Sequence, residues 1–345
     1  MTTARHPAPV RAPRRATPTP GRPLRVAFAG DATRFAAWVP GGVAAASGAG
    51  AASGAASPNG VAPRLQPHLV DTRATDADEV AELLRAARPD VVVALGVAAH
   101  DAAALSAAGV PVLGVAVPAE RPPVWAVKAA PPGEPPPAAL LHAAAAEERA
   151  RLYAPGSPGA ACDRLVALDP LDAVGARLWR TIAPPIDDAL FRPVTRASRP
   201  PRIVCAAPST DHREWWLGPA KHLHDVRHIA HGLTPDRLPA LLAQADVGVV
   251  PQATDRPTFD HRIALHLAAG HLVVAEPPHP KHGLEPGLDL LEPPSPDGLA
   301  RTLDAIRTAP DLFRRIRVRG RLKAERFRAT HVWERVLHDF LRDVG

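Results

Sequence analysis

The chain has 345 residues, more than a single hydrophobic core usually serves, so its length predicts two domains. Hydrophobic residues make up 46% of it, and its 42 prolines and 24 glycines stay below the share typical of a disordered polymer, which excludes a wholly unfolded protein. No apolar run reaches the length of a membrane span and no secretory signal opens the chain, so a cytoplasmic protein is expected.

The net charge of +6 is concentrated in two arginine-rich segments, residues 5–25 and residues 314–328. Such segments can bind nucleic acid, anionic lipid or a phosphorylated ligand, or they can be a solvated tail and a solvated helix face. No stacking aromatic side chains are interleaved with the arginines, so we favour the solvated interpretation and expect no nucleic-acid binding. Peripheral membrane contact through the basic segments is the alternative. Residues 1–22 are predicted to be a disordered, proline-rich tail.

Strands and helices alternate along residues 23–194, which predicts a first domain built on a doubly wound parallel sheet. Its clearest strand is 91–97 (VVVALGV), a continuous apolar run of the kind buried on both faces of such a sheet. The other strands are expected at 24–30, 65–70, 110–117 and 164–168, and the helices at 33–39, 80–87, 102–108, 139–152 and 171–178. Thr75 and Asp78 have the spacing of a capping box, and residues 41–60, mostly glycine, alanine and serine, are predicted to be a flexible loop.

The same alternation returns after a polar, proline-bearing linker at 195–201, so we place a second domain at 202–329. Strands are expected at 203–207, 226–230, 247–250 and 272–275, and helices around Glu214, after Thr234 as the N-cap, over 260–269 and from Ser295. A final helix over 330–345 has an apolar face that can pack back on the first domain. The predicted fold class is α/β, with two Rossmann-like doubly wound parallel-sheet domains that face a cleft.

Four stretches of the second half form an ordered series of motifs. In chain order they are 183–193 (APPIDDALFRP), His231-Gly232 with 238–251, 259–262 (FDHR) with 268–274, and 283–287 (GLEPG) with 297–300. Together they resemble the nucleotide-sugar domain of glycosyltransferases with the GT-B fold, above all the spore-maturation-protein-like group. The resemblance covers the first domain only in outline. It implies transfer of a sugar from a nucleotide-diphosphate donor to an acceptor that the sequence does not identify, with retention of configuration and without a metal or cofactor.

The sequence departs from the family pattern at two positions. The family has two glutamates, separated by seven residues, that reach the donor sugar and ribose, and the matching positions hold Pro257 and Leu265. Either other residues recognise the ribose, as in divergent branches, or the chain no longer transfers sugar. A catalytically inactive GT-B relative that binds a ligand or partner is therefore the main alternative, followed by a two-lobed small-molecule-binding protein and a nucleic-acid-binding protein.

The departing diphosphate carries negative charge, which cations and helix N-termini at the carboxyl ends of parallel strands can stabilise. The candidate donor-binding residues lie in the loops and helix starts that follow the strands: Thr210, Asp211, Arg213, His231, Gly232, Arg262 and Glu285. Arg213 can pair with phosphate in a fork, and Arg262 opens the helix of the family's second motif. The alternatives are a surface arginine beside an N-cap for Arg213, an ion pair with Asp260 or Glu285 for Arg262, and a turn acid for Glu285.

His100 follows the apolar strand 91–97 and is the candidate catalytic residue, because a histidine at a cleft edge can carry protons near neutral pH. A partly buried histidine that caps the next helix is the alternative. Trp215 and Trp216 are adjacent, so one of them can line the cleft while the other packs in the core.

Four closely spaced histidines raise the possibility of a metal site, which the predicted secondary structure disfavours. His222, His224, His228 and His231 lie close together in the sequence, but residues 225–229 favour a strand, which breaks the spacing that a helix would give. The two cysteines, Cys162 and Cys205, are too far apart for a zinc motif or a disulfide framework. We therefore predict no metal site.

Overall fold

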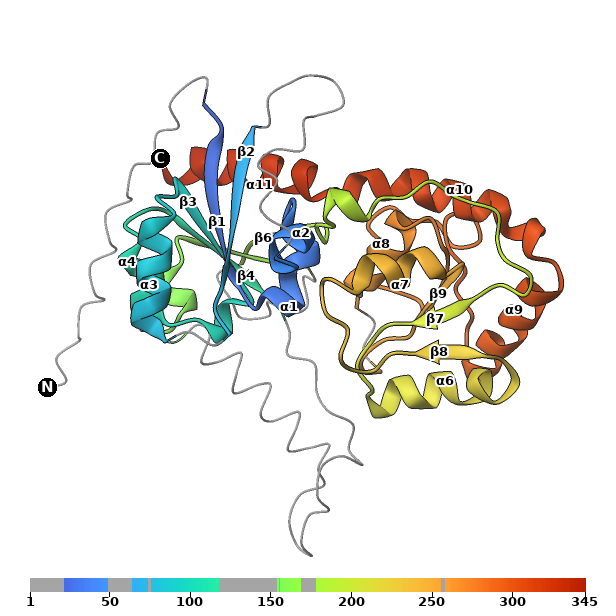
Figure 1. Ribbon diagram of the computed structural model, residues 1–345. Coiled ribbons are helices and arrows are strands. Elements are labelled where there is room, and N and C mark those ends of the chain that lie inside the picture. The colour runs from blue at the N-terminus through green and yellow to red at the C-terminus, as the bar shows by residue number, and fades with distance from the viewer. Residues whose placement is uncertain are drawn as a thin grey trace, which may run out of the picture.

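The computed structural model describes residues 22–48, 64–73, 76–117, 154, 156–168, 178–255 and 258–345, which form two domains (Figure 1). The first contains a parallel sheet of six strands in the order β2-β1-β3-β4-β5-β6, and the second a parallel sheet of four in the order β10-β9-β7-β8. The predicted pair of doubly wound parallel-sheet domains is therefore confirmed. Residues 1–21 of the tail predicted over 1–22 lie outside the described residues, and so does the predicted helix over 139–152.

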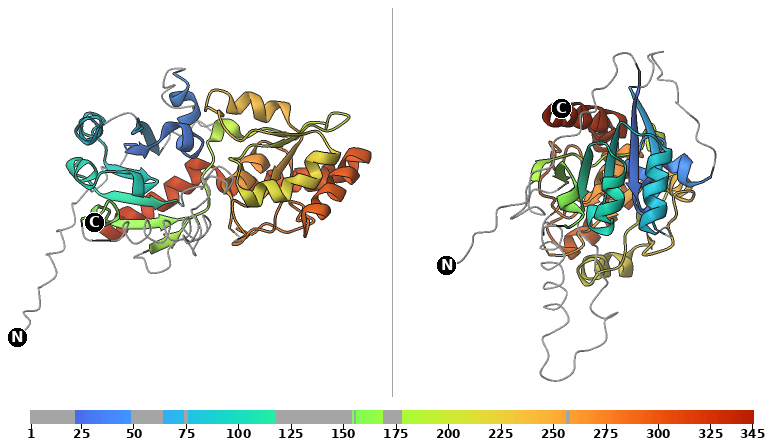
Figure 2. Two further views of the ribbon diagram at one scale, coloured as in Figure 1. Left: turned by 90° about the horizontal axis from the view of Figure 1, so that it is seen from below. Right: turned by 90° about the vertical axis from the view of Figure 1, so that its left-hand side faces the viewer.

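The first domain buries both faces of its sheet. Its strands are β1 (Leu24–Gly30), β2 (Leu65–Asp71), β3 (Val91–Leu95), β4 (Val112–Ala116), β5 (Arg164–Ala167) and β6 (Leu178–Thr181). Because successive side chains of a strand point to opposite faces, Ala27 packs with helices α3 (Ala77–Ala86) and α4 (Ala102–Ala107), whereas Phe28 packs with α11 (Ala329–Val344). Figure 2 shows α11 across the sheet from α3.

Three local predictions for the first domain are wrong. Residues 42–46 of the predicted flexible loop form helix α2 (Gly42–Ala46), because the buried Asp187 carboxylate accepts hydrogen bonds from the backbone N–H groups of Gly41 and Val43, each at 3.0 Å. Helix α3 is capped by Asp76, which accepts from the Glu79 N–H, and not by Thr75, which lies outside the described residues. Leu178 begins strand β6 where a helix was predicted, and 171–177 lie outside the described residues.

The second domain has helices on both faces of its smaller sheet. The strands are β7 (Ile203–Cys205), β8 (Val226–His228), β9 (Val247–Val250) and β10 (Leu272–Ala275). Helices α6 (Asp211–Leu223) and α9 (Pro296–Thr308) share one core, and α7 (Leu238–Gln244) and α8 (His261–Ala268) share the other. Helix α7 begins at Leu238, later than predicted, because residues 235–237 form a turn in which the Thr234 carbonyl accepts from the N–H groups of Arg237 and Leu238.

Two chain segments cross between the domains side by side. The Ile186 N–H donates to the Phe327 carbonyl at 2.7 Å, and the Ala329 N–H donates to the Ile186 carbonyl at 2.8 Å. Two guanidinium groups contact the ring of Phe191, that of Arg321 at 4.9 Å and that of Arg328 at 4.0 Å from the ring centroid. Hydrogen bonds and cation–π contacts therefore tie the outgoing chain to the segment that leads into α11.

The basic run at 314–328 is not the solvated helix face that was predicted. It forms α10 (Arg314–Lys323) and the short helix η8 (Ala324–Phe327). Arg317 is buried and donates from Nε and Nη2 to the Gly270 carbonyl, and Arg319 pairs with the buried Asp289 at 3.1 Å. Most of these cations therefore fasten α10 to the domain, and Arg314 and Arg315 are exposed. Among the described residues, no helix has both the length and the apolar character of a membrane span.

Candidate functional site

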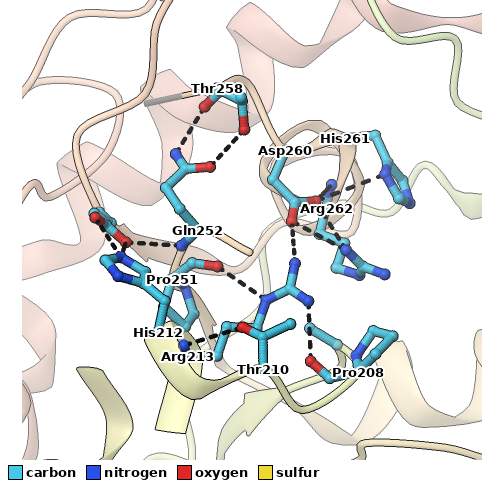
Figure 3. A network of polar contacts seen from close by, with 12 residues as sticks. Pro208, Thr210, His212, Arg213, Pro251, Gln252, Thr258, Asp260, His261 and Arg262 are labelled. Atoms are coloured by element: carbon cyan, nitrogen blue, oxygen red, sulfur yellow. Dashed lines mark hydrogen bonds and ion pairs between the residues drawn. The ribbon is translucent and has the colours of Figure 1, made fainter. Parts of the chain in front are cut away.

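Polar side chains converge where strands β7, β9 and β10 end (Figure 3). Thr210, His212 and Arg213 follow β7, Gln252 and Asp260 follow β9, and Glu276 directly follows β10. The strands are parallel and adjacent, so their carboxyl ends lie at one edge of the sheet, where ligands of open α/β sheets usually bind. We call this set of loops and helix starts the carboxyl edge.

Two helices begin at the carboxyl edge, each with a side-chain cap. The Thr210 hydroxyl accepts from the Arg213 N–H at 3.2 Å at the start of α6, and the Asp260 carboxylate accepts from the Arg262 N–H at 2.9 Å at the start of α8. Asp211 is the first residue of α6. The positive ends of both helix dipoles therefore lie near the same edge and favour negative charge there.

Asp260 joins the two predicted arginines. Arg213 Nη2 and Arg262 Nη1 each lie 3.0 Å from Asp260 Oδ2. Burial raises the pKa of Asp260, but the charges of Arg262, His261 and Arg213 outweigh it and hold that pKa below its usual value. The carboxylate is therefore ionised, and with two guanidinium groups the network has a net positive charge.

The two arginines differ in accessibility. The Arg213 side chain is 0% exposed, and it also donates from Nε to the Pro251 carbonyl and from Nη1 to the Pro208 carbonyl. A direct phosphate contact by Arg213 would require it to leave these acceptors, so in this structure it holds Asp260 in place. Arg262 forms the ion pair with Asp260 that was the alternative to a donor contact, and its side chain remains 13% exposed. Arg262 is therefore the one of the two that a ligand can reach.

A histidine–glutamate pair at the same edge was missed in the sequence. His212 Nε2 lies 2.9 and 3.0 Å from the two Glu276 oxygens, and the Gln252 N–H donates to Glu276 Oε2 at 2.8 Å. The Gln252 amide in turn pairs with the Thr258 hydroxyl and carbonyl. The sequence offered two signals for this pair, a histidine in the first turn of the helix after one strand and a glutamate directly after another strand. The two residues are 64 positions apart, so nothing local links them.

The other predicted donor residues are placed differently. His231 and Gly232 are exposed in the loop after β8, and Gly232 has a φ of 74°, which favours glycine. Glu285 pairs with Arg319 at 3.5 Å and with Lys323 at 3.3 Å, both in α10. The structure thus brings Thr210, Arg213 and Arg262 together, whereas Glu285 joins its loop to α10.

His100 lies at the corresponding edge of the first sheet. It is 8% exposed, and its Nε2 lies 3.0 Å from the carbonyl of Leu95, the last residue of β3. Burial lowers the pKa of His100, which favours the neutral ring. The alternative role of helix cap is wrong, because Asp101 caps α4 by accepting from the N–H groups of Ala103 and Ala104.

The first domain reaches the carboxyl edge of the second through Trp38. This residue ends the short helix η1 (Ala36–Trp38), and its ring lies edge-on to the ring of His261 with centroids 5.3 Å apart. His261 is the first residue of α8 and precedes Arg262. The two domains are therefore in contact beside the Asp260 network.

Metal-binding geometry is not found among the described residues, where no three histidine, cysteine or acidic side chains are placed to hold an ion. As predicted, His228 belongs to a strand, β8, and its Nε2 lies 2.9 Å from the Ala207 carbonyl. His224 Nε2 lies 2.9 Å from the Ala300 carbonyl. Backbone acceptors therefore engage both rings.

A cavity of about 680 Å³ lies elsewhere, between α6 and α9. Its lining includes Pro219, Leu223, Arg301 and Arg307, and therefore the C-terminal part of α6 and not the part near Thr210. None of the predicted donor-binding residues lines it.

No protein-family profile and no curated protein matches the sequence. The fold is similar to that of solved structures. HepE of Anabaena in complex with UDP-glucose superposes with a TM-score of 0.51 at 12% identity, covering 92% of this chain and 99% of that chain. A glycosyltransferase from Rickettsia africae gives a TM-score of 0.50 at 12% identity, covering 93% and 98%. The chain therefore has the GT-B fold, which confirms the fold that the sequence resemblance implied.

Proposed function

We propose that the chain is a glycosyltransferase that moves a sugar from a nucleotide-diphosphate donor to an acceptor. The observation that carries this proposal is the network of Arg262, Asp260 and Arg213 at the start of α8. It places a net positive charge and a helix N-terminus at the carboxyl edge of a GT-B fold. HepE, which has a similar fold, was solved with UDP-glucose.

In this proposal Arg262 and the N-terminus of α8 bind the diphosphate. The leaving diphosphate gains negative charge as the sugar bond breaks, and fixed cations and dipoles stabilise that charge without a metal. Arg213 keeps the Asp260 carboxylate in place, and Asp260 in turn orients Arg262. Catalysis by this route depends on positioned charge, and we infer that it proceeds with retention of configuration, as the family resemblance implies.

Because the two family carboxylates are missing, other residues have to recognise the hydroxyl groups of the donor in this proposal. Leu265 is 5% exposed and packs in the core beneath α8, so it has no contact to offer a donor. Pro257 lies outside the described residues. Glu276 is a carboxylate at the same edge, and it is available for the role that the two family glutamates have elsewhere.

His100 remains the proposed proton-handling residue of the first domain, and the acceptor is unassigned. Peripheral membrane contact stays a proposal for the surface of α10. Arg314 and Arg315 are exposed there, and Leu312, close to them in the sequence, is 78% exposed. This contact would suit an acceptor carried by a lipid.

The second candidate function is ligand binding without turnover, which the burial of Leu265 favours. An assay that follows release of nucleoside diphosphate from UDP-glucose, ADP-glucose and GDP-mannose, with and without EDTA, separates the two candidates. A glycosyltransferase is expected to release diphosphate slowly from at least one donor even in EDTA. Binding without release would leave only the second candidate, and absence of binding at millimolar donor would contradict both.

A further inference from the structure

The histidine–glutamate pair at the carboxyl edge has an open hydrogen-bonding side. Glu276 is acceptor-only when ionised, so His212 donates from Nε2 and its orientation is fixed. Among the described residues, no group bonds the other ring nitrogen, Nδ1. The side chains are 16% and 13% exposed, so both are accessible from solvent. Nδ1 can accept a proton-bearing group when the ring is neutral and donate when it is charged.

The carboxylate also has unused capacity. Glu276 Oε1 accepts from His212, and Oε2 accepts from His212 and from the Gln252 N–H. Two carboxylate oxygens offer about four acceptor positions in all, so at least one remains for a ligand hydroxyl. The pair can therefore bind a group that both donates and accepts, as a sugar hydroxyl does.

An exposed aromatic ring lies beside this pair. Trp215 is 61% exposed, and its ring centroid is 5.8 Å from that of His212. Its neighbour Trp216 is 5% exposed and packs in the core of the domain. Of the two adjacent tryptophans, the outward one thus stands next to the polar pair. A large ring that is left in solvent at a candidate ligand site is an unusual use of tryptophan and favours contact with a ligand ring.

The pair adjoins the residues that bind the diphosphate in the proposed function. His212 directly precedes Arg213, which bonds Asp260, and Gln252 follows Pro251, whose carbonyl accepts from Arg213. In a nucleotide sugar the sugar is bonded to the terminal phosphate, so its binding site has to adjoin the phosphate site. A second phosphate is disfavoured at this position because the Glu276 carboxylate would repel it.

Building on the proposed function, we propose that His212, Glu276 and Trp215 form the subsite for the donor's hexose ring. His212 Nδ1 and the Glu276 carboxylate bind sugar hydroxyls, and the Trp215 ring covers one face of the sugar. These three side chains supply the recognition that the sequence lacks at Pro257 and Leu265.

The test compares the sugar-bearing ligand with the diphosphate alone. Affinities of UDP, ADP and GDP and of UDP-glucose, ADP-glucose and GDP-mannose are measured calorimetrically for the wild type and for His212→Gln, Glu276→Gln and Trp215→Ala. His222→Gln is the control, because His222 is exposed near the other end of α6. The decisive quantity is the affinity for a nucleotide sugar divided by that for its diphosphate.

Loss of a hydrogen bond to a charged group is expected to lower this ratio about 10-fold in Glu276→Gln and in His212→Gln, and the control is expected to leave it unchanged. Retained diphosphate affinity shows that each variant is folded. A ratio that stays unchanged, including the case in which the affinities for both ligands fall equally, would overturn the sugar subsite. If the wild type binds no diphosphate at all, the proposed function fails instead.

Discussion

Trp333 in the C-terminal helix donates its indole N–H to the backbone carbonyl of Trp38 at 2.8 Å. The Trp38 ring in turn meets His261, which begins α8. The helix that returns to the first domain therefore holds the segment through which that domain contacts the second, beside the Asp260 network. The position of α11 is thereby linked to the geometry of the carboxyl edge.

Replacing each tryptophan by phenylalanine separates the hydrogen bond from the packing. Both side chains are buried, but Trp38 Nε1 has no hydrogen-bond acceptor among the described residues, whereas Trp333 Nε1 does. Trp333→Phe leaves a buried carbonyl without its donor, so we expect it to lower the free energy of unfolding by about 1–3 kcal/mol more than Trp38→Phe does. Urea unfolding measures both. An equal or larger loss for Trp38→Phe would contradict the assigned role of the hydrogen bond.

Asp260→Asn is expected to destabilise the second domain strongly. The substitution keeps the shape of the side chain but leaves the fully buried Arg213 guanidinium without its counter-charge, which costs about 3–5 kcal/mol. Asp311→Asn is the matched control, because Asp311 pairs with Arg199 and both side chains are more than half exposed. We expect the control to change the unfolding free energy by no more than about 0.5 kcal/mol in the same urea titration. Similar losses of unfolding free energy in the two variants would show that burial of the Asp260 network adds nothing to stability.

Leu265→Glu restores a family carboxylate at its position in the sequence, but we expect that its side chain would not reach a donor. Leu265 lies in the core of the second domain, so the new side chain would bury a charge without a partner. We expect a loss of about 3 kcal/mol or more in unfolding free energy, no gain in donor affinity, and a much smaller loss for the volume-conserving Leu265→Met. Thermal melting and a donor titration check this. A stable Leu265→Glu variant with tighter donor binding would contradict the placement of Leu265.

Stability is expected to fall between about pH 6.5 and pH 4 through a buried histidine pair. His266 Nδ1 and His271 Nδ1 are 2.9 Å apart, and His271 Nε2 lies 2.8 Å from the Leu242 carbonyl. Burial lowers the pKa of His271 to about 4; Arg317 and Arg192 also lower it, while the Leu242 carbonyl and Asp246 oppose them. A lowered pKa in the folded state means that the unfolded chain binds the proton more tightly. Stability is therefore complete above pH 6.5 and declines as the pH falls.

For His271 alone this decline amounts to about 3 kcal/mol, from the shift between its ordinary and folded pKa values. Urea unfolding at pH 7 and at pH 4.5 measures it, and His271→Gln is expected to flatten the difference. A wild-type protein that is equally stable at the two pH values would contradict neutral burial of the pair.

Most of the strands could be predicted because they contain apolar runs, as in VVVAL of β3, whereas β6 (LWRT) has no such run and its first residue was predicted as the end of a helix. The α2 helix could not be predicted, since its cap is Asp187, 144 residues beyond Val43 in the chain. For the same reason the sequence showed Arg213 as a phosphate-binding candidate but not its burial against Pro208, Pro251 and Asp260. Local patterns reveal which residues carry charge, whereas the partners that neutralise that charge are set by tertiary packing.

The His212–Glu276 pair illustrates the same limit. Neither residue belongs to the family motifs, and only the order of the strands brings the end of β10 close to the first turn of α6. The converse holds for α10, where an arginine-rich sequence suggested a solvated face but Arg317 and Arg319 are fastened to buried backbone and carboxylate acceptors.

Donor binding at the carboxyl edge is tested most directly by calorimetric titration of UDP, ADP and GDP into the wild type, Arg262→Gln and Arg314→Gln. Arg314 is exposed on α10, so its variant matches the change in net charge without touching the edge. We predict that at least one diphosphate binds the wild type, that Arg262→Gln weakens it about 10-fold, and that Arg314→Gln leaves it within about twofold. Absence of diphosphate binding at millimolar concentration would contradict donor binding at the carboxyl edge. Equal diphosphate affinity in Arg262→Gln and the wild type would contradict it as well.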